Sequence, residues 1–506
     1  MTQNAKSLKK NTITNFLEVG YTTIIGIVML PLYLQYLGKE SFGLIGFFTV
    51  LQAWMQLLDM GMSPMLSRQA ARARGHNIDF LELKKLVRSL EIIFFIIALI
   101  IVLSILVSSD WIANYWLKVE LLSLTKVAFC ITLMGIIIGL RFFSSLYSSG
   151  IMGMENQVLL NIVTIILTTL KFVGVLLLLH FVTQEIVDFF IYQLILSMIE
   201  LAVLSVMFYR LIPTKDKVGI GFFWDTLKPI LPFATGITYV TVIWVFLTQI
   251  DKVILSKVLT LSEYGYFALV TVIAAGISQI SGPISHAILP RMTYLLSQGK
   301  EKDMLTLYRK STQFMAVIIL PLSGMIAVFS TELLFAWTGD RKAAEWAGPI
   351  LFWFVLGNGI LAIVAFQYYL QFAHGKLRMH VIYNSVFASI QIPVMIYVAF
   401  EYGAMGVAKT WFVFMLISFI IWTPIVHNKF APGIHWTWLF KDVAPIFVST
   451  AAAILFFEGL DIGFAGMTRM EVFVVLISIG IVILMLNMLV SSASRELFKI
   501  YFRRYI

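Results

Sequence analysis

The chain has 506 residues, of which 60% are apolar and 13% are charged, and its net charge at pH 7 is +10. Soluble domains are about 45–50% apolar and about 25% charged, so this composition excludes a soluble enzyme and a disordered chain. Cys130 is the only cysteine, which also excludes a secreted scaffold held by disulfides. Continuous apolar runs of about twenty residues, the length a helix needs to cross a bilayer, predict a polytopic all-α membrane protein. These runs lack the alternation of apolar and polar residues that is typical of a membrane β-barrel.

In chain order, the apolar runs predict fourteen membrane-spanning helices. The first follows a basic stretch, as in a signal peptide, but its apolar run is too long and no small-residue cleavage site follows it, so we expect it to be retained. The eleventh and twelfth spans are separated only at Glu401–Gly403. The predicted spans are 13–37, 41–66, 89–108, 127–148, 158–180, 187–209, 229–255, 263–289, 313–336, 348–372, 382–400, 405–426, 443–458 and 470–490.

Lysine and arginine counts in the loops predict the orientation. With the N-terminus in the cytoplasm, the cytoplasmic segments hold 26 of these residues and the opposite segments hold 7. We therefore expect both termini and the basic loops around 67–88 and 291–312 in the cytoplasm, with the loop 109–126 outside. The same bias explains the net charge without nucleic acid, because basic loops face an anionic inner leaflet.

The loops leave no room for a soluble catalytic domain. The longest, around 67–88, 210–228 and 291–312, have about twenty residues each. The sequence has no G-x-x-x-x-G-K-[ST] loop, so the chain is not expected to be its own ATPase. Its seven histidines are scattered, so we expect no metal site. We also expect a transporter and not an enzyme, with no cofactor and no catalytic residue.

Two segments of the sequence resemble each other at a fixed offset of 222 residues. Tyr36–Val50 aligns with Val258–Val272, and the alignment pairs Phe42-Gly43 with Tyr264-Gly265. The two segments occupy the same place in two halves of six spans each. Because six is even, the halves share one topology and are expected to be related by an axis along the membrane normal, as in transporters built from parallel repeats.

This repeat predicts two six-helix lobes around a central cavity, with alternating access from rocking of one lobe against the other. The absence of a filter-like re-entrant loop favours a transporter over a channel. The expected domains are an N-terminal lobe at 1–210, a cytoplasmic linker at 211–228, a C-terminal lobe at 229–428, and two additional spans with a cytoplasmic tail at 429–506.

Several motifs in this order resemble the Wzx-type polysaccharide flippases of the multidrug/oligosaccharidyl-lipid/polysaccharide exporter superfamily. The opening Phe16–Arg68 contains Leu37–Gly43, Gln249–Leu255 is followed by Glu263-Tyr264-Gly265, and Gln371–Arg378 follows the tenth span. The resemblance covers roughly residues 10–430. Fourteen spans are typical of the longer flippases.

The resemblance implies a function and a location. Members of this family move undecaprenyl-diphosphate-linked oligosaccharide units from the cytoplasmic to the periplasmic leaflet of the bacterial inner membrane, before polymerisation into O-antigen of lipopolysaccharide, capsule or exopolysaccharide. They are driven by ion gradients, so protons or sodium are expected coupling ions in an antiport. The implied partners are the lipid-linked oligosaccharide, membrane lipids, a polysaccharide polymerase and a chain-length regulator.

Polar side chains within the predicted spans mark candidate positions on the transport path. Such groups are unfavourable in hydrocarbon and face the bundle interior or a hydrated cavity, and they recur at helical spacing on one face of several spans. Cations there would attract a diphosphate and amides would bind sugar hydroxyls, although small polar residues also join helices to each other. The candidates are Gln52, Gln56, Asp59, Arg141, Lys171, Glu200, Asp251, Lys252, Gln367 and Gln371.

Four of these charges predict two ion pairs. Asp59 and Arg141 lie at matched depth in their predicted spans, and Lys171 and Glu200 lie deeper. One interpretation is two fixed salt bridges, because unpaired charges at this depth are strongly unfavourable. Our hypothesis is that the pairs are switchable, with an arriving diphosphate taking a cation and the freed carboxylate taking a proton.

Three other functions remain open from the sequence. A multidrug/cation antiporter of the same superfamily usually has twelve spans and would need a dominant buried acid. A lipid II flippase also has fourteen spans, but its characteristic opening is not evident here. A glycosyltransferase or polymerase would carry a long outer loop with acidic or arginine-rich motifs, whereas 109–126 has only Asp110 and Glu120 as acids.

Overall fold

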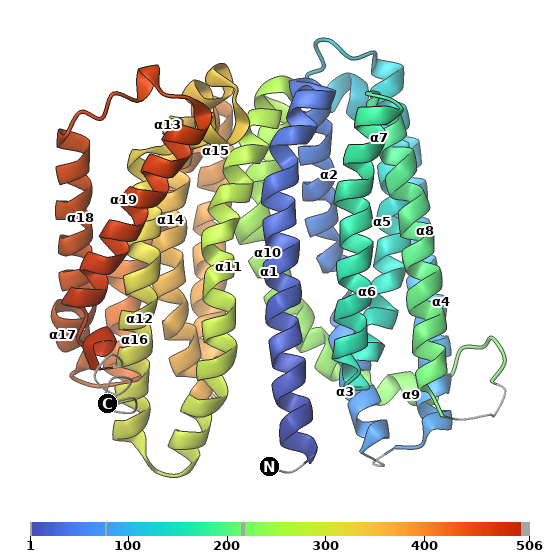
Figure 1. Ribbon diagram of the computed structural model, residues 1–506. Helices are drawn as coiled ribbons and strands as arrows, with labels where there is room; N and C mark the ends of the chain where they lie inside the picture. Colours follow the sequence, from blue (N-terminus) through green and yellow to red (C-terminus); the bar gives the residue numbers. More distant parts are fainter. Residues whose placement is uncertain (1–2, 76–77, 214–217, 497–506) are drawn as a thin grey trace. The chain divides into compact units, whose positions relative to one another are not determined.

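The structure is a computed structural model, shown in Figure 1, and it describes residues 3–75, 78–213 and 218–496. Asn77 of the first basic loop, 214–217 of the predicted linker and 497–506 of the predicted tail lie outside the described residues. The regular secondary structure of the described residues is helical, apart from an isolated parallel bridge between Lys118 and Thr260. Thirteen of its helical segments are long and apolar enough to cross a membrane. The prediction of an all-α polytopic protein is confirmed.

The chain forms two compact units, Met1–Gly265 and Tyr266–Ile506. This division follows packing, whereas the predicted lobes at 1–210 and 229–428 follow the repeat and stay a prediction. Unit 1 contains α1 (Gln3–Leu37), α2 (Lys39–Leu58), α3 (Met62–Arg74), α4 (Phe80–Trp111), α5 (Leu124–Gly153), α6 (Gln157–Thr169), α7 (Val175–Phe181), α8 (Ile186–Leu211), α9 (Trp224–Leu227), α10 (Leu231–Val258) and the start of α11 (Leu261–Ser297). Short π-helical or 3₁₀ segments lie at Ile112–Trp116, Leu170–Gly174 and Lys228–Ile230.

Unit 2 contains the rest of α11 and the remaining helices. These are α12 (Glu301–Val328), α13 (Ser330–Thr338), α14 (Arg341–Ala373), α15 (Arg378–Ile417), α16 (Thr423–Phe430), α17 (Ile434–Thr437), α18 (Ala444–Gly459) and α19 (Arg469–Val490). Short π-helical or 3₁₀ segments lie at Ser418–Trp422, Trp438–Val443 and Phe464–Gly466.

The predicted second span, 41–66, is wrong at its inner end. Helix α2 ends at Leu58, and α3 begins at Met62 after a turn in which Met60 and Gly61 have φ of 48° and 68°. These positive φ values are incompatible with a continuing right-handed helix. The hydropathy window ran through the turn because Met60 and Met62 are themselves apolar.

The basic loops at 67–88 and 291–312 are largely helical. Helices α3 and α4 extend into the first, and α11 and α12 extend into the second, leaving the short breaks 75–79 and 298–300. In Figure 1, the start of α1, the end of α3, the start of α4 and the end of α8 lie at the same end of unit 1, called here the basic end. This common end agrees with the charge pattern within unit 1.

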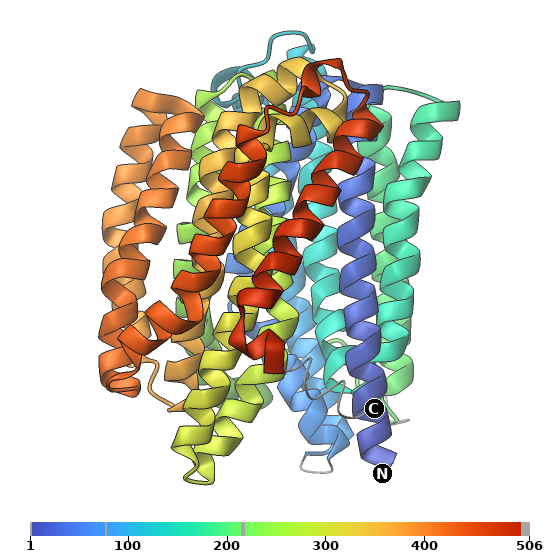
Figure 2. The same cartoon turned by 60° about the vertical axis from the view of Figure 1, so that its left-hand side comes forward.

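The eleventh and twelfth spans form a hairpin that reverses at Gly403. Helical hydrogen bonding runs through 378–430, about 80 Å if straight, but Gly403 has φ 59° and ψ −153°, outside the helical region. The rings of Tyr383 and Trp422 stack with centroids 3.9 Å apart, although a straight helix would place them about 58 Å apart. Figure 2 shows the two orange arms side by side. The thirteen apolar segments of the described residues therefore contain fourteen helices long enough to cross a membrane, in agreement with the prediction.

The repeat appears as a reciprocal contact between the starts of α2 and α11. A Cβ at Gly43 would lie 2.0 Å from the carbonyl oxygen of Leu261, and one at Gly265 would lie 2.5 Å from that of Lys39. With the offset of 222, Gly265 corresponds to Gly43 and Leu261 corresponds to Lys39. Each repeat therefore packs the same glycine against the same position of its counterpart, as across a two-fold axis, and neither glycine has room for a side chain.

The end of unit 1 opposite the basic end is closed by a buried carboxylate. Glu40, at the start of α2, is 3% exposed and accepts hydrogen bonds from the backbone N–H groups of Glu120, Leu121 and Leu122 at 2.5, 2.7 and 2.9 Å. The backbone N–H of Leu261 donates to the carbonyl oxygen of Lys118 at 2.9 Å. The loop after α4 is thus bonded both to α2 and to the turn between α10 and α11.

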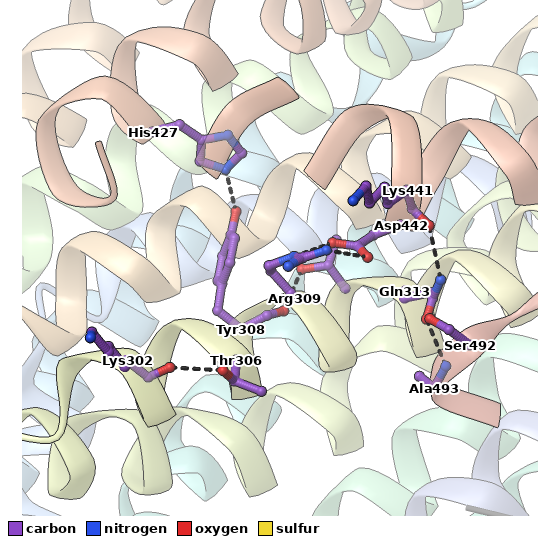
Figure 3. Close-up of polar contacts among 11 residues, drawn as sticks. Lys302, Thr306, Tyr308, Arg309, Gln313, His427, Lys441, Asp442, Ser492 and Ala493 are labelled. Atoms are coloured by element: carbon purple, nitrogen blue, oxygen red, sulfur yellow. Dashed lines mark hydrogen bonds and ion pairs between the residues drawn. The ribbon is translucent and has the colours of Figure 1, made fainter. Parts of the chain in front are cut away.

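In unit 2, polar side chains of α12 hold the additional C-terminal helices (Figure 3). The Arg309 guanidinium makes a two-pronged contact with the Asp442 carboxylate, at 2.6 and 3.0 Å. Within the repeat, the Tyr308 hydroxyl lies 2.7 Å from His427 Nε2 of α16. Beyond the repeat, the Gln313 amide oxygen accepts from the backbone N–H of Ala493 at 2.8 Å. Spans outside the repeat are therefore attached through specific hydrogen bonds as well as apolar packing.

Candidate functional site

Three charged residues lie close to the middle of three helical segments of unit 1. Arg141 is in α5, Glu200 is in α8, and Lys171 is in the continuous segment 157–181 formed by α6, a π-helical turn and α7. Each is within three residues, about 4 Å, of the midpoint of its segment. Transporters place their substrate and ion sites near this depth, and we call these residues with Gln193 and Ser197 the mid-membrane cluster.

Hydrogen bonds connect the members of the mid-membrane cluster. The Lys171 ammonium lies 2.7 Å from the Glu200 carboxylate, and the two side chains are 17% and 19% exposed. Arg141 donates from Nη2 to the Gln193 amide oxygen at 2.8 Å and from Nε to the Ser197 hydroxyl at 3.2 Å. Gln193 in turn donates to the Lys171 carbonyl oxygen at 3.0 Å. Gln193 therefore links the Arg141 guanidinium to the backbone of Lys171.

Lys171 of the cluster lies in a π-helical turn, Leu170–Gly174, whose carbonyl oxygens bind neighbouring helices. Such turns interrupt the regular hydrogen-bond ladder and occur frequently at functional sites. Its carbonyl oxygens at Leu170 and Phe172 accept from the hydroxyls of Tyr192 at 3.2 Å and Tyr33 at 2.7 Å. Side chains of α1 and α8 thus fix the segment that carries Lys171, a feature that no sequence pattern had indicated.

The mid-membrane cluster has one more positive charge than negative. Among the described residues, Arg141 has hydrogen bonds only to neutral side chains, and its guanidinium lies over the Phe48 ring at 5.4 Å. A cation–π contact of this kind adds modest stability without neutralising the charge. The surplus charge and the guanidinium donors suit an anionic ligand, above all a phosphate.

One face of α2 continues from the cluster toward the basic end. Phe48 contacts Arg141, and Gln52, Gln56 and Asp59 follow at helical spacing on the same face. These three polar residues line a cavity of about 300 Å³ that also touches α5 and α10 through Ser145 and Thr241. The predicted polar stripe of the second span therefore faces a cavity within unit 1.

Asp59 follows the last residue of α2 and binds the first turn of α3 instead of pairing with Arg141. Its carboxylate accepts from the backbone N–H of Ser63 at 3.2 Å and from the Ser63 hydroxyl. In the described structure, no ion pair joins it to Arg141, so that predicted pair is wrong, whereas the pair of Lys171 with Glu200 is confirmed. The reason is depth: α5 continues to Gly153, which places Arg141 about 18 Å from the inner end of that helix.

Asp59 lies in the turn that follows the membrane-spanning part of α2, and burial raises its pKa above the usual value. The hydrogen bonds from Ser63 act in the opposite direction, because they stabilise the carboxylate. The carboxyl is therefore disposed to take up a proton more readily than a solvated aspartate.

Asp251 and Lys252 are neighbours in α10 and form their own ion pair. The Lys252 ammonium lies 3.3 Å from Asp251, which is 4% exposed, and the Lys252 carbonyl oxygen accepts from the Tyr264 hydroxyl at 3.2 Å. In the described part of unit 1, neither side chain bonds to the mid-membrane cluster. The structure thus places this pair at the packing of α10 against the start of α11.

Gln367 and Gln371 lie one turn apart on α14 of unit 2. Both are 0% exposed, and Gln371 donates to the Gln367 carbonyl oxygen at 3.1 Å. With no exposed surface in this conformation, they face helix packing instead of a hydrated path.

Sequence reasoning missed two acidic residues that organise unit 1. Glu40 gathers three backbone donors, as described above, and Glu91 of α4 accepts from the hydroxyls of Tyr147 at 2.7 Å and Tyr209 at 2.5 Å. Glu91 lies inside the predicted third span, and an acid in such a run is itself a signal of function.

The chain matches the family model described as polysaccharide biosynthesis protein over residues 8–296. The comparison with curated proteins found no match. Among solved structures, the lipid II flippase MurJ in an inward closed conformation is similar, with a TM-score of 0.69 and 15% identity over 94% of this chain and 97% of that chain. An inward-facing multidrug resistance MATE transporter of the MOP superfamily is similar with a TM-score of 0.67 and 13% identity, over 80% and 95%. At these identities the likeness shows the fold, which is that of the MOP superfamily transporters.

Proposed function

The chain belongs to the polysaccharide biosynthesis protein family, and we propose that it is a flippase for undecaprenyl-diphosphate-linked oligosaccharides in surface polysaccharide assembly. The observation that carries this proposal is the surplus positive charge of the mid-membrane cluster in unit 1. A transported lipid diphosphate is anionic, and guanidinium and ammonium groups are its natural partners. The transporter fold supports movement of the substrate in place of chemical conversion.

In this proposal Arg141 is the principal phosphate ligand. Its present partners are neutral, so a phosphate oxygen can displace the Gln193 amide without breaking an ion pair. Lys171 would exchange Glu200 for phosphate in a second step, because its ion pair is 2.7 Å long and mostly buried. In this proposal the two steps give the site a graded affinity, so that the diphosphate can be bound and later released.

The cavity beside α2 would receive the sugar part. Amides such as Gln52 and Gln56 donate and accept hydrogen bonds and so match sugar hydroxyls without requiring a particular charge. Asp59, at the basic end of this cavity, is our candidate for proton coupling because burial raises its pKa. We propose that Asp59 is protonated in one conformation and ionised in the other.

The proposed location is the bacterial inner membrane, with both termini cytoplasmic. The test uses single cysteines at Asn77 and Ser123 in a chain whose native Cys130 is replaced by alanine. A membrane-impermeant thiol reagent should label position 123 in intact cells after the outer membrane is permeabilised, and position 77 only after lysis. Labelling of both positions from the same side would contradict the topology.

The function itself is tested by deleting the gene. Surface polysaccharide should be lost while complete undecaprenyl-diphosphate-linked units accumulate in the inner leaflet. Loss of the first lipid-linked sugar in isolated membranes would instead indicate an enzyme. Purified protein in vesicles should also move a fluorescent lipid-linked oligosaccharide across the bilayer.

A multidrug/cation antiporter is the second candidate, favoured by the fold shared with MATE transporters. A cation site should carry excess negative charge, whereas the mid-membrane cluster carries excess positive charge. Transport of rhodamine-type cations by the same vesicles, with no movement of the lipid-linked oligosaccharide, would support the antiporter over the flippase. Lipid II is the further alternative substrate, and it is distinguished by its own transport assay.

A further inference from the structure

A second cavity of unit 1, separate from the mid-membrane cluster, opens between α4, α5 and α8 near the basic end. Its volume is about 710 Å³. The walls include Ile92, Phe95, Phe143 and Val206, and Phe95 and Val206 are 61% and 51% exposed. Side chains this apolar on the outside of a membrane helix are solvated by lipid tails. The cavity therefore communicates with the bilayer.

The polar end of this cavity is built around Glu91. The carboxylate accepts from the hydroxyls of Tyr147 and Tyr209 and from Arg88 Nη1, the last at 2.8 Å. The Arg88 guanidinium also lies over the Tyr209 ring at 5.1 Å. Its buried Nε has no hydrogen-bond partner in the described structure. Glu91 takes one guanidinium donor of Arg88, and this side chain lines the cavity, so its remaining donors can bind a further acceptor.

A second arginine makes the cavity electropositive. Arg210, the penultimate residue of α8, lines the same cavity, is exposed, and forms no ion pair with the described residues. Arg88, Glu91 and Arg210 together carry one net positive charge. A single phosphodiester would neutralise this charge and supply acceptors for both arginines.

The connection after α8 places the cavity mouth at the membrane interface. The Phe223 backbone N–H donates to the Ser89 hydroxyl at 2.7 Å, which fixes the connection to α4. Phe222 and Trp224 stack with centroids 6.1 Å apart, and both side chains are half-exposed. Aromatic residues gather at the headgroup level of membranes. Ile220, which is 86% exposed, lies at the cavity itself.

We propose that this cavity binds an anionic phospholipid from the leaflet at the basic end of unit 1. The phosphate would lie between Arg88 and Arg210, and an acyl chain would follow Phe95 and Val206. Basic pockets between transmembrane helices are suited to anionic lipid headgroups. This lipid is a resident ligand and not the transported substrate, because the site shares no residue with the mid-membrane cluster.

The test measures lipid binding to the full chain by native mass spectrometry in detergent. Dioleoyl phosphatidylglycerol should bind more tightly than dioleoyl phosphatidylcholine. Arg210→Gln should weaken phosphatidylglycerol binding about fivefold, equivalent to about 1 kcal/mol for one interfacial cation. Ser205→Trp, which fills the cavity from α8, should abolish binding. The matched control Lys228→Gln removes an exposed cation near the same end, outside the cavity, and should leave binding unchanged.

Equal binding of the two lipids, or unchanged phosphatidylglycerol binding in both cavity variants, would overturn the proposal. Tight binding of soluble glycerol 1-phosphate in competition with phosphatidylglycerol would also overturn it, since that result shows a soluble-anion site. Arg141→Gln should leave phosphatidylglycerol binding intact, which separates this result from the outcome for the proposed transport function. A thermal melt of each variant confirms that it is folded.

Discussion

Unit 1 and unit 2 each bury charged side chains, but the two networks differ in charge balance and depth. In unit 2, Arg309 and Asp442 form a two-pronged neutral pair eight residues after the start of α12. In unit 1, Arg141, Lys171 and Glu200 lie at mid-helix and leave one cation without a carboxylate. A balanced pair near a helix end can hold helices together. An unbalanced cluster at the midplane lowers stability and so indicates a ligand.

The largest expected effect is on stability in unit 2. Arg309→Gln removes the partner of Asp442, which is 7% exposed, and should lower the stability of the folded chain by about 2–4 kcal/mol. Thermal unfolding in detergent measures the change. The neighbouring variant Lys310→Gln breaks only an exposed pair with Glu496 and should change stability little. Equal losses of stability in the two variants would contradict a special structural role for the buried pair.

The second prediction concerns the surplus cation of unit 1. Arg141→Gln should reduce transport about 10- to 100-fold, because a hydrogen bond to a charged group contributes about 1.5–3 kcal/mol. Its thermal stability should equal or exceed that of the wild type, since no carboxylate loses its partner and an unbalanced charge is removed. Arg141→Lys keeps the charge but loses the planar set of guanidinium donors, so its transport should lie between that of Arg141→Gln and that of the wild type. A folded Arg141→Gln variant with normal transport would contradict the assignment.

The third prediction separates structure from function within one pair. Glu200→Gln leaves Lys171 without its carboxylate and should destabilise the chain by about 1–2 kcal/mol. Reversing both charges, Lys171→Glu with Glu200→Lys, should recover most of that stability. If phosphate binding requires a cation at position 171, transport should not recover in the double variant. Full transport by the double variant in the same vesicles would show that this pair has only a structural role, like the pair of Arg309 with Asp442.

The smallest expected effect is the pH dependence at Asp59. Because burial raises the pKa of this carboxyl in the folded protein, its contribution to stability is present below the ordinary value of about 3.9 and is lost as pH rises through the raised pKa. Asp59→Asn resembles the protonated acid at every pH. The variant should therefore gain stability over the wild type as pH increases from about 4.5 to 8. A difference in melting temperature between Asp59→Asn and the wild type that stays constant across this pH range would contradict the raised pKa of Asp59.

The sequence determined the class of the protein because hydropathy acts locally. Runs of about twenty apolar residues must be helical in a bilayer, where each helix satisfies its own backbone hydrogen bonds, and Gly403 marked the turn between two of them. The repeat was readable from Gly43 and Gly265, since a close backbone approach leaves room only for glycine. The pairing of Lys171 with Glu200 was also predicted correctly, because the residue counts placed both charges at similar depth in their spans.

Tertiary structure alone decided which charges meet. Arg141 appeared to match Asp59 in depth, but the turn at Met60-Gly61 and the longer α5 separate them, and neither change alters hydropathy. The partners of Arg141 are an amide and a hydroxyl of α8, which carry no charge that a sequence pattern could pair. The same holds for Glu40, whose three donors are backbone N–H groups of a distant loop. Every residue has such a donor except proline, so only the folded chain shows which of them an acid binds.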